Sequence, residues 1–505
     1  MYNKLMPGDD SPLAFPKQAD KPRLTAYEHY DKLYFGDHYA AFAIKAEKGF
    51  TEKYSRLRYI VSNFAGLMSR VMADMLFGEK IVIDCDDKSN QAWVDGFVED
   101  NHLFAQLYES ALGNSRRGDS VFKLRIGPRD NSLTADSTVI AEEITPAIYF
   151  PILDLSSGRM TPVKDVLIWT FKQGTKNYIH VETHTVGYIQ NEIFEYNPDN
   201  QRIGARQDVT AFGFEETQET KASRSLIFHI PNVRDGSSYF GTSDYKDLEQ
   251  LFFALNNRIT SIDNILDKHS DPILAVPPGV IDENGQVSKA ALNLFEVDNE
   301  NPGFNKPEYI VWNANLDNAM KQVDKLVDML FMFSEISPST MGVDVGGGQA
   351  ESGRALKFKL MRTIAKRNRK KIYYDIAMKE MLETAMELGK NWAIKIDDST
   401  VTTPEKPKID WGDGIIPDVV EDTDVEIKRI EAGISSRADA IARLDGSTPE
   451  EAAAKVKEID KENAIVVPSL DKPANLGKPS EPRGTVSPPT DPNAPTPPVA
   501  APAGK

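Results

Sequence analysis

Three polar residues near the middle of the chain have the spacing of a metal site on a strand. His180, Glu182 and His184 alternate along one segment, and residues two apart in a strand share a face of the sheet. Imidazole and carboxylate groups are ligands that zinc accepts. Solvent-facing polar residues on a half-buried sheet alternate in the same way, and the pattern favours this second interpretation.

Motifs for nucleotide binding or nucleophilic catalysis are incomplete. Gly348 and Gly353 have the spacing of a P-loop, but Arg354 and Ala355 follow where a phosphate-binding loop needs Lys and then Ser or Thr. Cys85, the only cysteine, has no base near it in the sequence, and no Gly-x-Ser-x-Gly elbow occurs. We therefore predict a protein that is not an enzyme and that needs no cofactor and no metal.

The highest local charge lies in residues 354–371, which include nine Lys or Arg side chains and no acid. Such a run can contact DNA phosphates, or it can pair with acidic surfaces of neighbouring subunits. The second interpretation is favoured because the charges spiral around the predicted helix and form no single stripe. The candidate residues for either contact are Arg354, Lys357, Lys359, Arg362, Lys366 and Arg367.

Composition narrows the class of protein further. The chain has 505 residues and a formal net charge of −17, and 40% of its residues are hydrophobic. This length predicts about three structural units with real buried cores. No apolar run reaches the roughly 18 residues of a membrane span, and residues 1–11 do not have the pattern of a secretory signal. We expect an intracellular, acidic protein without disulfides that does not grip nucleic acid over its whole surface.

The hydrophobic pattern predicts an α+β unit in the N-terminal part, up to about residue 231. Helical spacing occurs over 54–77 and 91–113, and strand-like segments follow one another over 166–196. The turn at 197–200, Asn-Pro-Asp-Asn, is typical of a hairpin. These strands are expected to form an antiparallel meander.

The middle of the chain predicts two long helices with a small tip between them. Residues 243–267 and 316–336 both have heptad-like apolar spacing, so both helices should pack along other long helices. The segment between them, 271–313, is rich in Pro and Gly and has two short strand-like runs. The predicted order along the chain is a long helix that leads away from the N-terminal unit, a small β-rich tip, and a second long helix that returns toward that unit.

A glycine-rich loop and a third long helix follow the second heptad helix. The loop covers 337–351, and the helix is predicted from about 352 to 388. Shorter helices are predicted over 423–432, 436–444 and 448–462. Residues 471–505 contain ten prolines and no aromatic residue, and this composition predicts a disordered tail.

Several short segments, in this order along the chain, resemble the portal proteins of tailed double-stranded DNA bacteriophages, in the siphophage-type family. They are Tyr239-Phe240-Gly241-Thr242-Ser243-Asp244-Tyr245, Ile336-Ser337-Pro338-Ser339-Thr340-Met341-Gly342, Glu351-Ser352-Gly353-Arg354-Ala355-Leu356, Ile409-Asp410-Trp411-Gly412-Asp413 with Ile415-Ile416-Pro417-Asp418, and Ile434-Ser435-Ser436-Arg437-Ala438-Asp439-Ala440-Ile441. Each segment is short, and their order and spacing together carry the resemblance.

The resemblance implies an α+β portal fold with an α/β wing, a two-helix stem, a small β-rich clip, a long wing helix and a helical crown. The implied boundaries are the wing at 1–236, the first stem helix at 237–270, the clip at 271–313, the second stem helix at 314–336, the tunnel loop at 337–351, the long wing helix and returning wing segment at 352–420, the crown at 421–465 and the disordered Pro-rich tail at 466–505.

The resemblance also implies a function. It implies a homo-oligomeric ring, usually of twelve subunits, at one capsid vertex of the virion, through which double-stranded DNA is packaged and ejected. The chain would be in the host cytoplasm during assembly. The implied partners are further copies of the chain, the DNA, the terminase large subunit, the major capsid and scaffolding proteins and a head-completion or adaptor protein, with no membrane.

Position alone selects the residues that would make these contacts. The tunnel-loop residues expected to face the DNA are Val343, Asp344, Val345, Gly346, Gly347, Gly348 and Gln349, and the clip residues expected to dock terminase or connector proteins are Val280, Asp282, Glu283 and Asn284. Two other functions stay open: a metal-dependent enzyme built on His180, Glu182 and His184, and a coiled-coil adaptor that would form elongated dimers.

Overall fold

A computed structural model describes most of the chain. The described residues are 15–42, 59–128, 137–154, 156, 160–236, 238–270, 273–275, 308–310, 316–342, 353–412, 419–445 and 447–466. They fall into two compact units, Met1–Asp418 and Val419–Lys505. No helix among the described residues combines the length and the apolar character that crossing a membrane requires.

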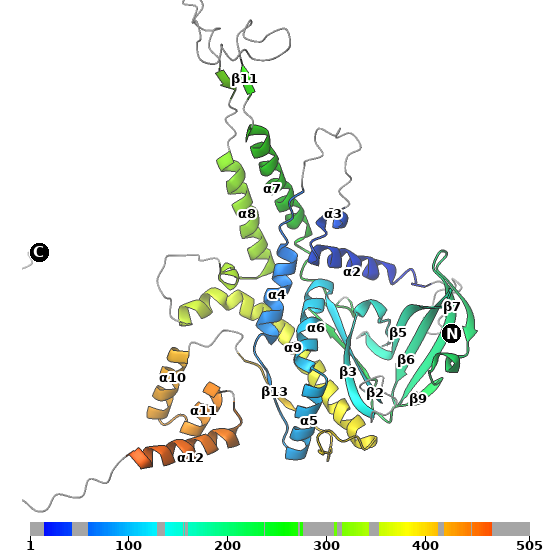
Figure 1. The fold of residues 1–505 in the computed structure, drawn as a ribbon, viewed down its shortest axis with the longest axis vertical. Helices are drawn as coiled ribbons and strands as arrows, with labels where there is room; N and C mark the ends of the chain where they lie inside the picture. The colour runs from blue at the N-terminus through cyan, green and yellow to red at the C-terminus, as the bar shows by residue number, and fades with distance from the viewer. Residues whose placement is uncertain are drawn as a thin grey trace, which may run out of the picture. The chain divides into compact units, whose positions relative to one another are not determined.

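The first unit begins with a group of helices (Figure 1). They are α2 (Lys21–Tyr34), α3 (His38–Ala41), α4 (Phe64–Phe77), α5 (Lys88–Asp100) and α6 (Leu103–Arg117). The sequence predicted α4 from residue 54, but residues 59–63 are not helical. The helix begins at Phe64 because the Asn63 side chain accepts a hydrogen bond from the Gly66 amide and caps it.

The single helix predicted over 91–113 is in fact two helices, α5 and α6. His102 lies between them with a φ of 49°, in the left-handed region. The Asn101 side chain donates to the Val139 carbonyl and accepts from the Ala141 amide. A side chain held by a neighbouring strand therefore fixes the break, and hydrophobic periodicity could not have shown it.

Two antiparallel sheets follow the helices. The three-stranded sheet has the order β10-β2-β3, and the larger sheet has the order β4-β5-β6-β7-β8, with β9 paired to β7. The predicted antiparallel meander is confirmed. The strands are β2 (Asp119–Pro128), β3 (Ser137–Ile144), β4 (Ile152–Asp154), β5 (Thr161–Gln173), β6 (Lys176–Thr185), β7 (Tyr188–Asn197), β8 (Arg202–Gln207), β9 (Thr217–Glu219) and β10 (Ile227–Pro231).

Helices α7 (Glu249–Ser270) and α8 (Leu316–Ser334) lie side by side, with strands β11 (Ile273–Ala275) and β12 (Glu308–Ile310) paired at their far end (Figure 1). The predicted heptad faces meet each other, because Phe252, Leu255 and Leu330 are buried in one cluster. Helix α7 begins at Glu249 instead of the predicted residue 243, since the chain between 243 and 248 is held in turns by the contacts described below.

Helix α9 (Gly353–Asn391) has 39 residues and is close to the predicted range of 352–388. Its second half packs in the largest core of the first unit, with Tyr374, Met381 and Leu382 against Trp93 and Phe122. The short strands β1 (Val82–Asp84) and β13 (Lys408–Asp410) pair beside this core.

The second unit contains α10 (Val419–Glu431), α11 (Arg437–Asp445) and α12 (Pro449–Val466). The three helices predicted in this region are confirmed, with α10 beginning four residues before the predicted 423. Thr448 and Glu451 cap the start of α12 by reciprocal hydrogen bonds between side chain and backbone amide. The Pro-rich tail that the sequence predicts lies outside the described residues.

Candidate functional site

Residues 241–245 connect the body of the first unit to α7, and we call this segment the anchor. Its backbone lies against the turn after α6, where Gly118 has a φ of 92°. A side chain at Gly241 would overlap the Gly118 carbonyl oxygen, and a side chain at Gly118 would lie 2.7 Å from the Ser243 amide nitrogen. Both positions therefore require glycine for steric reasons.

Asp244 is the charged centre of the anchor. Its carboxylate lies 3.1 Å from Lys366 Nζ and 2.6 Å from Lys370 Nζ, both on α9. The hydroxyl of Ser115, on α6, donates to the same carboxylate at 2.6 Å. Only 7% of the Asp244 side chain and 1% of the Lys370 side chain are exposed. The pair of lysines thus balances a buried negative charge.

Burial and the neighbouring charges shift the pKa values of these groups in opposite directions. Burial alone would raise the pKa of Asp244, but Lys366 and Lys370 hold it well below its usual range. Burial lowers the pKa of Lys370 to about 8, although Asp244 opposes this effect. The Asp244 carboxylate is therefore charged at neutral pH.

Neighbouring residues of the anchor fix it to α6 again and to two further elements. The Ser243 hydroxyl donates to the Arg116 carbonyl, and the Tyr245 hydroxyl donates to the Ala65 carbonyl of α4 at 2.8 Å. The Gly241 amide donates at 2.8 Å to the carboxylate of Asp119, at the start of β2. The anchor therefore joins α4, α6, β2 and α9, which are far apart in the sequence.

The end of α8 is fixed to the same part of α9. Lys366 Nζ donates to the Ser334 carbonyl at 2.9 Å. The Ser337 amide donates to the Thr363 hydroxyl at 2.8 Å, just before the short 3-10 helix η4 (Pro338–Met341). Lys366 therefore binds both the start of the segment leading into α7 and the end of α8. The arrangement can hold a two-helix projection rigidly.

The candidate basic residues have different positions. Lys366 and Arg367 are buried, and Arg367 donates to the Gly412 carbonyl. Arg362 is exposed and Lys359 is half-buried. Arg354 and Lys357 lie in α9, but their side chains lie outside the described residues. The structure thus gives Lys366 and Arg367 partners within their own chain, and contacts of the run with DNA or with another subunit stay a prediction.

The remaining predicted site residues cannot be placed. The tunnel-loop residues 343–349 and the clip residues Val280, Asp282, Glu283 and Asn284 lie outside the described part of the chain. Between Ile310 and Leu316, and between Gly342 and Gly353, only the flanking elements are described. The roles assigned to these segments stay predictions.

The alternating polar residues of β6 are buried, so the interpretation of a solvent-facing strand surface is wrong. His180 and His184 have no exposed surface, and Glu182 is 6% exposed. They share one face, as predicted, and it packs toward β2, where Lys123 Nζ lies 2.6 Å from a Glu182 oxygen. The sequence could not show this because the groups that cover the face, such as Lys123 over Glu182 and Phe214 over His180, come from separate segments of the chain.

Each of these groups has a partner of its own within the chain. The His180 ring lies between Trp169 and Phe214. Its Nε2 is 3.0 Å from the Asn191 side-chain oxygen. His184 forms a hydrogen bond with Glu182. Burial would raise the pKa of Glu182, but His184 and Lys123 lower it to about 2. Among the described residues, no three His, Cys, Asp or Glu side chains are grouped to hold a metal ion.

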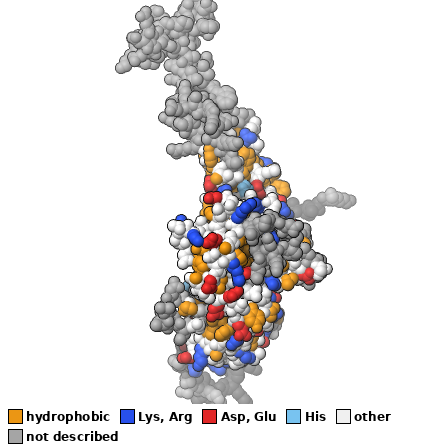
Figure 2. Space-filling model, turned by 90° about the vertical axis from the view of Figure 1, so that its right-hand side faces the viewer, with side chains coloured by type: hydrophobic (Ala, Val, Ile, Leu, Met, Phe, Trp, Pro, Cys, Tyr) orange, Lys and Arg blue, Asp and Glu red, His pale blue; other side chains and the backbone are white. Residues whose placement is uncertain are grey.

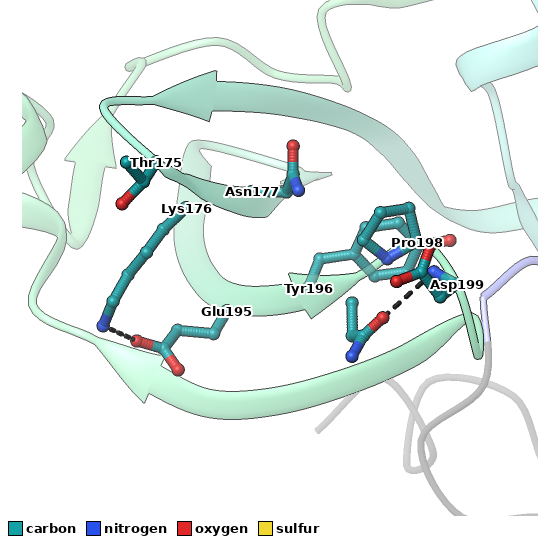
Figure 3. Close-up of a pocket in the computed structure, with 8 residues that line it drawn as sticks. Thr175, Lys176, Asn177, Glu195, Tyr196, Pro198 and Asp199 are labelled. Carbon is teal, nitrogen blue, oxygen red and sulfur yellow. Dashed lines mark hydrogen bonds and ion pairs between the residues drawn. The ribbon is translucent and has the colours of Figure 1, made fainter.

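A surface hollow of about 290 Å³ lies between the β6 and β7 ends of the larger sheet (Figure 3). In this hollow, Lys176 Nζ lies 2.6 Å from a Glu195 carboxylate oxygen. The Asn197 side chain accepts from the Asp199 amide in the hairpin turn. The hollow is open and is lined by the start of β6, the end of β7 and the two adjoining turns.

The family comparison gives the class of the protein. The family model described as phage portal protein, SPP1 Gp6-like, matches residues 160–465, which include the anchor, the helical pair α7 and α8, and α9. The chain therefore belongs to this family of phage portal proteins. Portal proteins are structural parts of phage particles. The contacts of the anchor hold elements of one chain together.

Solved structures with a similar arrangement have little sequence in common with this chain. One, from the virion of a native gene transfer agent (GTA) particle, has 11% identity and a TM-score of 0.45, and the match covers 87% of this chain and 96% of that one. Another, from the neck of a native GTA particle computed with C12 symmetry, has 12% identity and a TM-score of 0.39, with 75% and 89% covered. A third, from the neck of an empty GTA particle, has 12% identity and a TM-score of 0.40, with 77% and 92% covered. No curated protein matches the chain.

Sequence reasoning missed the anchor as a site. It predicted a helix from residue 243, whereas the Ser243 hydroxyl accepts from the Tyr245 amide in a turn that precedes α7. One signal was available: Lys366 and Lys370 are four residues apart and so share a helix face. Two lysines on an otherwise buried face require a carboxylate partner, but the sequence did not show which one.

Proposed function

We propose that copies of this chain close into a ring, usually of twelve, at one vertex of a phage capsid, around a channel through which double-stranded DNA is packaged and ejected. Membership of the portal family is the observation that carries the proposal. The chain would assemble in the host cytoplasm and remain in the virion.

The elements of the first unit have the roles that such a ring needs. Helices α7 and α8 would form the stem, and residues 1–236 with 352–420 would form the wing. The segment 271–313 would be the clip, which docks the terminase large subunit during packaging and a head-completion protein afterwards. Residues 337–351 would be the tunnel loop, and 421–465 the crown that adjoins the major capsid and scaffolding proteins.

The charge of the helical pair is consistent with a channel that lets DNA slide. The exposed acids Asp317, Asp324 and Asp328 of α8 alternate with Lys321 and Lys325. Figure 2 shows another face of the chain, on the side of the larger sheet, and there too acidic, basic and apolar side chains are mixed without a broad positive surface. Tight phosphate binding needs many uncompensated Lys or Arg contacts. A mixed lining favours passage of DNA over binding.

The proposal is tested by imaging the purified full chain by negative-stain electron microscopy. We expect ring-shaped particles with a central channel, and mass photometry should give a mass near twelve times 56.2 kDa. A chain that stays monomeric under all assembly conditions, or that forms only elongated dimers, contradicts the proposal. Elongated dimers would instead support the coiled-coil adaptor.

A further inference from the structure

Asn232 brings a primary amide into the buried charge cluster around Asp244. The residue directly follows β10, and its backbone amide donates to the Gly118 carbonyl at 2.8 Å. Only 1% of Asn232 is exposed. Its side chain contacts both Asp244 and Lys370, so an amide, a carboxylate and an amine meet in a place from which water is nearly excluded.

Hydrogen bonds fix the direction in which the Asn232 amide points. Its Nδ2 donates to the Thr242 carbonyl at 2.9 Å and to Asp244 Oδ1 at 3.1 Å. Both partners are acceptors, so the NH2 group must face them. The amide oxygen then faces Lys370, whose Nζ donates to it. The amine of Lys370 thus lies beside the carbonyl group of a buried amide.

The Asp244 carboxylate contacts both members of this pair. Its Oδ2 lies 2.6 Å from Lys370 Nζ, and its Oδ1 accepts from Asn232 Nδ2. Transfer of an acyl group from one nitrogen to another needs a base at the attacking amine and an acid at the leaving nitrogen. A carboxyl group that contacts both nitrogens can serve as the base first and as the acid afterwards.

The charges of the cluster favour loss of one ammonium group. Among the described residues, Lys366 and Lys370 face the single carboxylate of Asp244, and their side chains are 9% and 1% exposed. A buried charge without a counter-charge is costly. Burial also lowers the pKa of Lys370 to about 8, so a fraction of its amine is neutral and nucleophilic near neutral pH.

We propose that Lys370 and Asn232 form an intramolecular isopeptide bond. The neutral Nζ of Lys370 attacks Cγ of Asn232, a C–N bond forms between these two atoms, and the bond from Cγ to Nδ2 breaks. Asp244 takes the proton from Nζ and gives it to Nδ2, which leaves as ammonia. The products are a secondary amide and ammonia, so the step consumes no oxidant, reductant or cofactor.

The bond changes both the charge and the connectivity of the anchor. The Lys370 ammonium group is replaced by a neutral amide, and Lys366 alone then balances Asp244. The bond joins residues that are 138 positions apart, and a crosslink that closes so long a loop disfavours the unfolded chain. It fixes α9 to the end of β10, beside the segment that leads into α7. Because the bond lies within one chain, it does not depend on the proposed function.

The first test is mass spectrometry of the full folded chain. The wild type should weigh less than its sequence by one ammonia molecule, and digestion should release a branched peptide that joins Asn232 to Lys370. Lys370→Arg and Asn232→Ala should both have the full mass of their sequences. Lys379→Gln is the matched control on α9, because Lys379 pairs with Asp375 at 2.7 Å, and this variant should keep the branched peptide.

Two outcomes of this test overturn the proposal. One is a wild-type chain that keeps its full mass after long incubation in the folded state. The other is a loss of ammonia found only in a linear peptide, because an asparagine that closes to a succinimide loses the same mass. Neither outcome depends on how a variant folds, since both are measured on the wild type. Ring formation is scored separately and bears only on the proposed function.

The second test addresses the proton transfer by Asp244. Wild-type and Asp244→Asn chains that have never folded are isolated from inclusion bodies in urea and refolded at a temperature at which circular dichroism shows both to be folded. The bonded fraction is followed by mass over time. We expect the bond to form at least about a hundredfold more slowly in Asp244→Asn, because the variant lacks the base. Equal rates in the two folded chains overturn the role of Asp244.

Discussion

Asp244 connects elements that are far apart in the sequence. Its carboxylate accepts a hydrogen bond from the Ser115 hydroxyl of α6. It also forms ion pairs with the Lys366 and Lys370 ammonium groups of α9. Since all of these groups are nearly buried, neither the carboxylate nor the ammonium groups can be rehydrated if a partner is removed. The free energy of folding therefore depends strongly on this one side chain.

Asp244→Asn is expected to lower the free energy of unfolding by about 3 kcal/mol, because it leaves two buried ammonium groups without a counter-charge. The measurement is urea unfolding of the full chain, followed by circular dichroism. Asp317→Asn, at an exposed position of α8, is the control and should change stability by less than about 0.5 kcal/mol. Equal midpoints for the two variants would show that the cluster contributes nothing.

Glu182 gives a prediction for pH. Its pKa is lowered from 4.5 to about 2, so between these values the folded chain binds fewer protons than the unfolded chain. The resulting stability is fully present above about pH 4.5 and is lost as the pH falls toward 2. It amounts to about 3 kcal/mol.

Glu182→Gln should therefore be less stable than the wild type at neutral pH, and the difference should shrink as the pH falls from about 5 to 2. Chemical unfolding at a series of pH values measures it. A difference that stays constant over this range would contradict the assigned pKa.

At the scale of elements, two close approaches of backbone decide where α7 starts. Gly241 and Gly118 lie in contact, and this contact brings the anchor against the end of α6. The heptad pattern alone extended the helix back to residue 243. The turn between 243 and 248 replaces the first helical turns because hydrogen bonds to Arg116 and Ser115 stabilise it instead.

Gly241→Ala is expected to destabilise the chain by about 1–3 kcal/mol, since the new methyl group overlaps the Gly118 carbonyl. Gly113→Ala is the matched control. Gly113 lies inside α6, and the nearest atom to an added methyl group would be a Glu143 oxygen at 3.8 Å. That variant should be neutral or gain up to about 1 kcal/mol. Equal thermal stabilities of the two variants would refute the close approach.

At the scale of the whole molecule, assembly and DNA passage are separate properties. The contacts that fix α7, α8 and α9 to one another lie within one chain. The glycine-rich segment 343–349, which lies outside the described residues, is proposed to face the DNA as part of the tunnel loop. Changes in that segment should therefore affect DNA and leave the ring unchanged.

Deletion of Gly346–Gly348 is expected to leave ring assembly intact and to impair DNA packaging, because the tunnel loop would lose its adaptable backbone. Ring formation is measured by electron microscopy and packaging by nuclease-protected DNA in assembled heads. Replacement of the same three glycines by serines keeps the loop length. Comparison with this variant separates the effect of a shorter loop from the effect of a less adaptable backbone. Normal DNA filling by the deletion variant would refute the role of the loop.

Much of the local structure follows from the sequence. The heptad helices, the meander and α9 follow from periodicity, because a period of 2 or 3.6 residues reports which side of an element is buried. The order of the short motifs predicted the portal family, which the family match confirms. These features depend on neighbours within about one element length, and the sequence contains that information.

Only the tertiary structure decided which charges are buried and with which partners. The sequence interpretation assigned Lys366 and Lys370 to a basic surface. It assigned three residues to an exposed strand face: His180, Glu182 and His184. In both cases a distant segment covers the group: Asp244 meets the lysines, and Lys123 of the second sheet meets Glu182. Such pairings cross more than 50 residues of sequence, and a local pattern carries no information about which distant segment will lie on top of it.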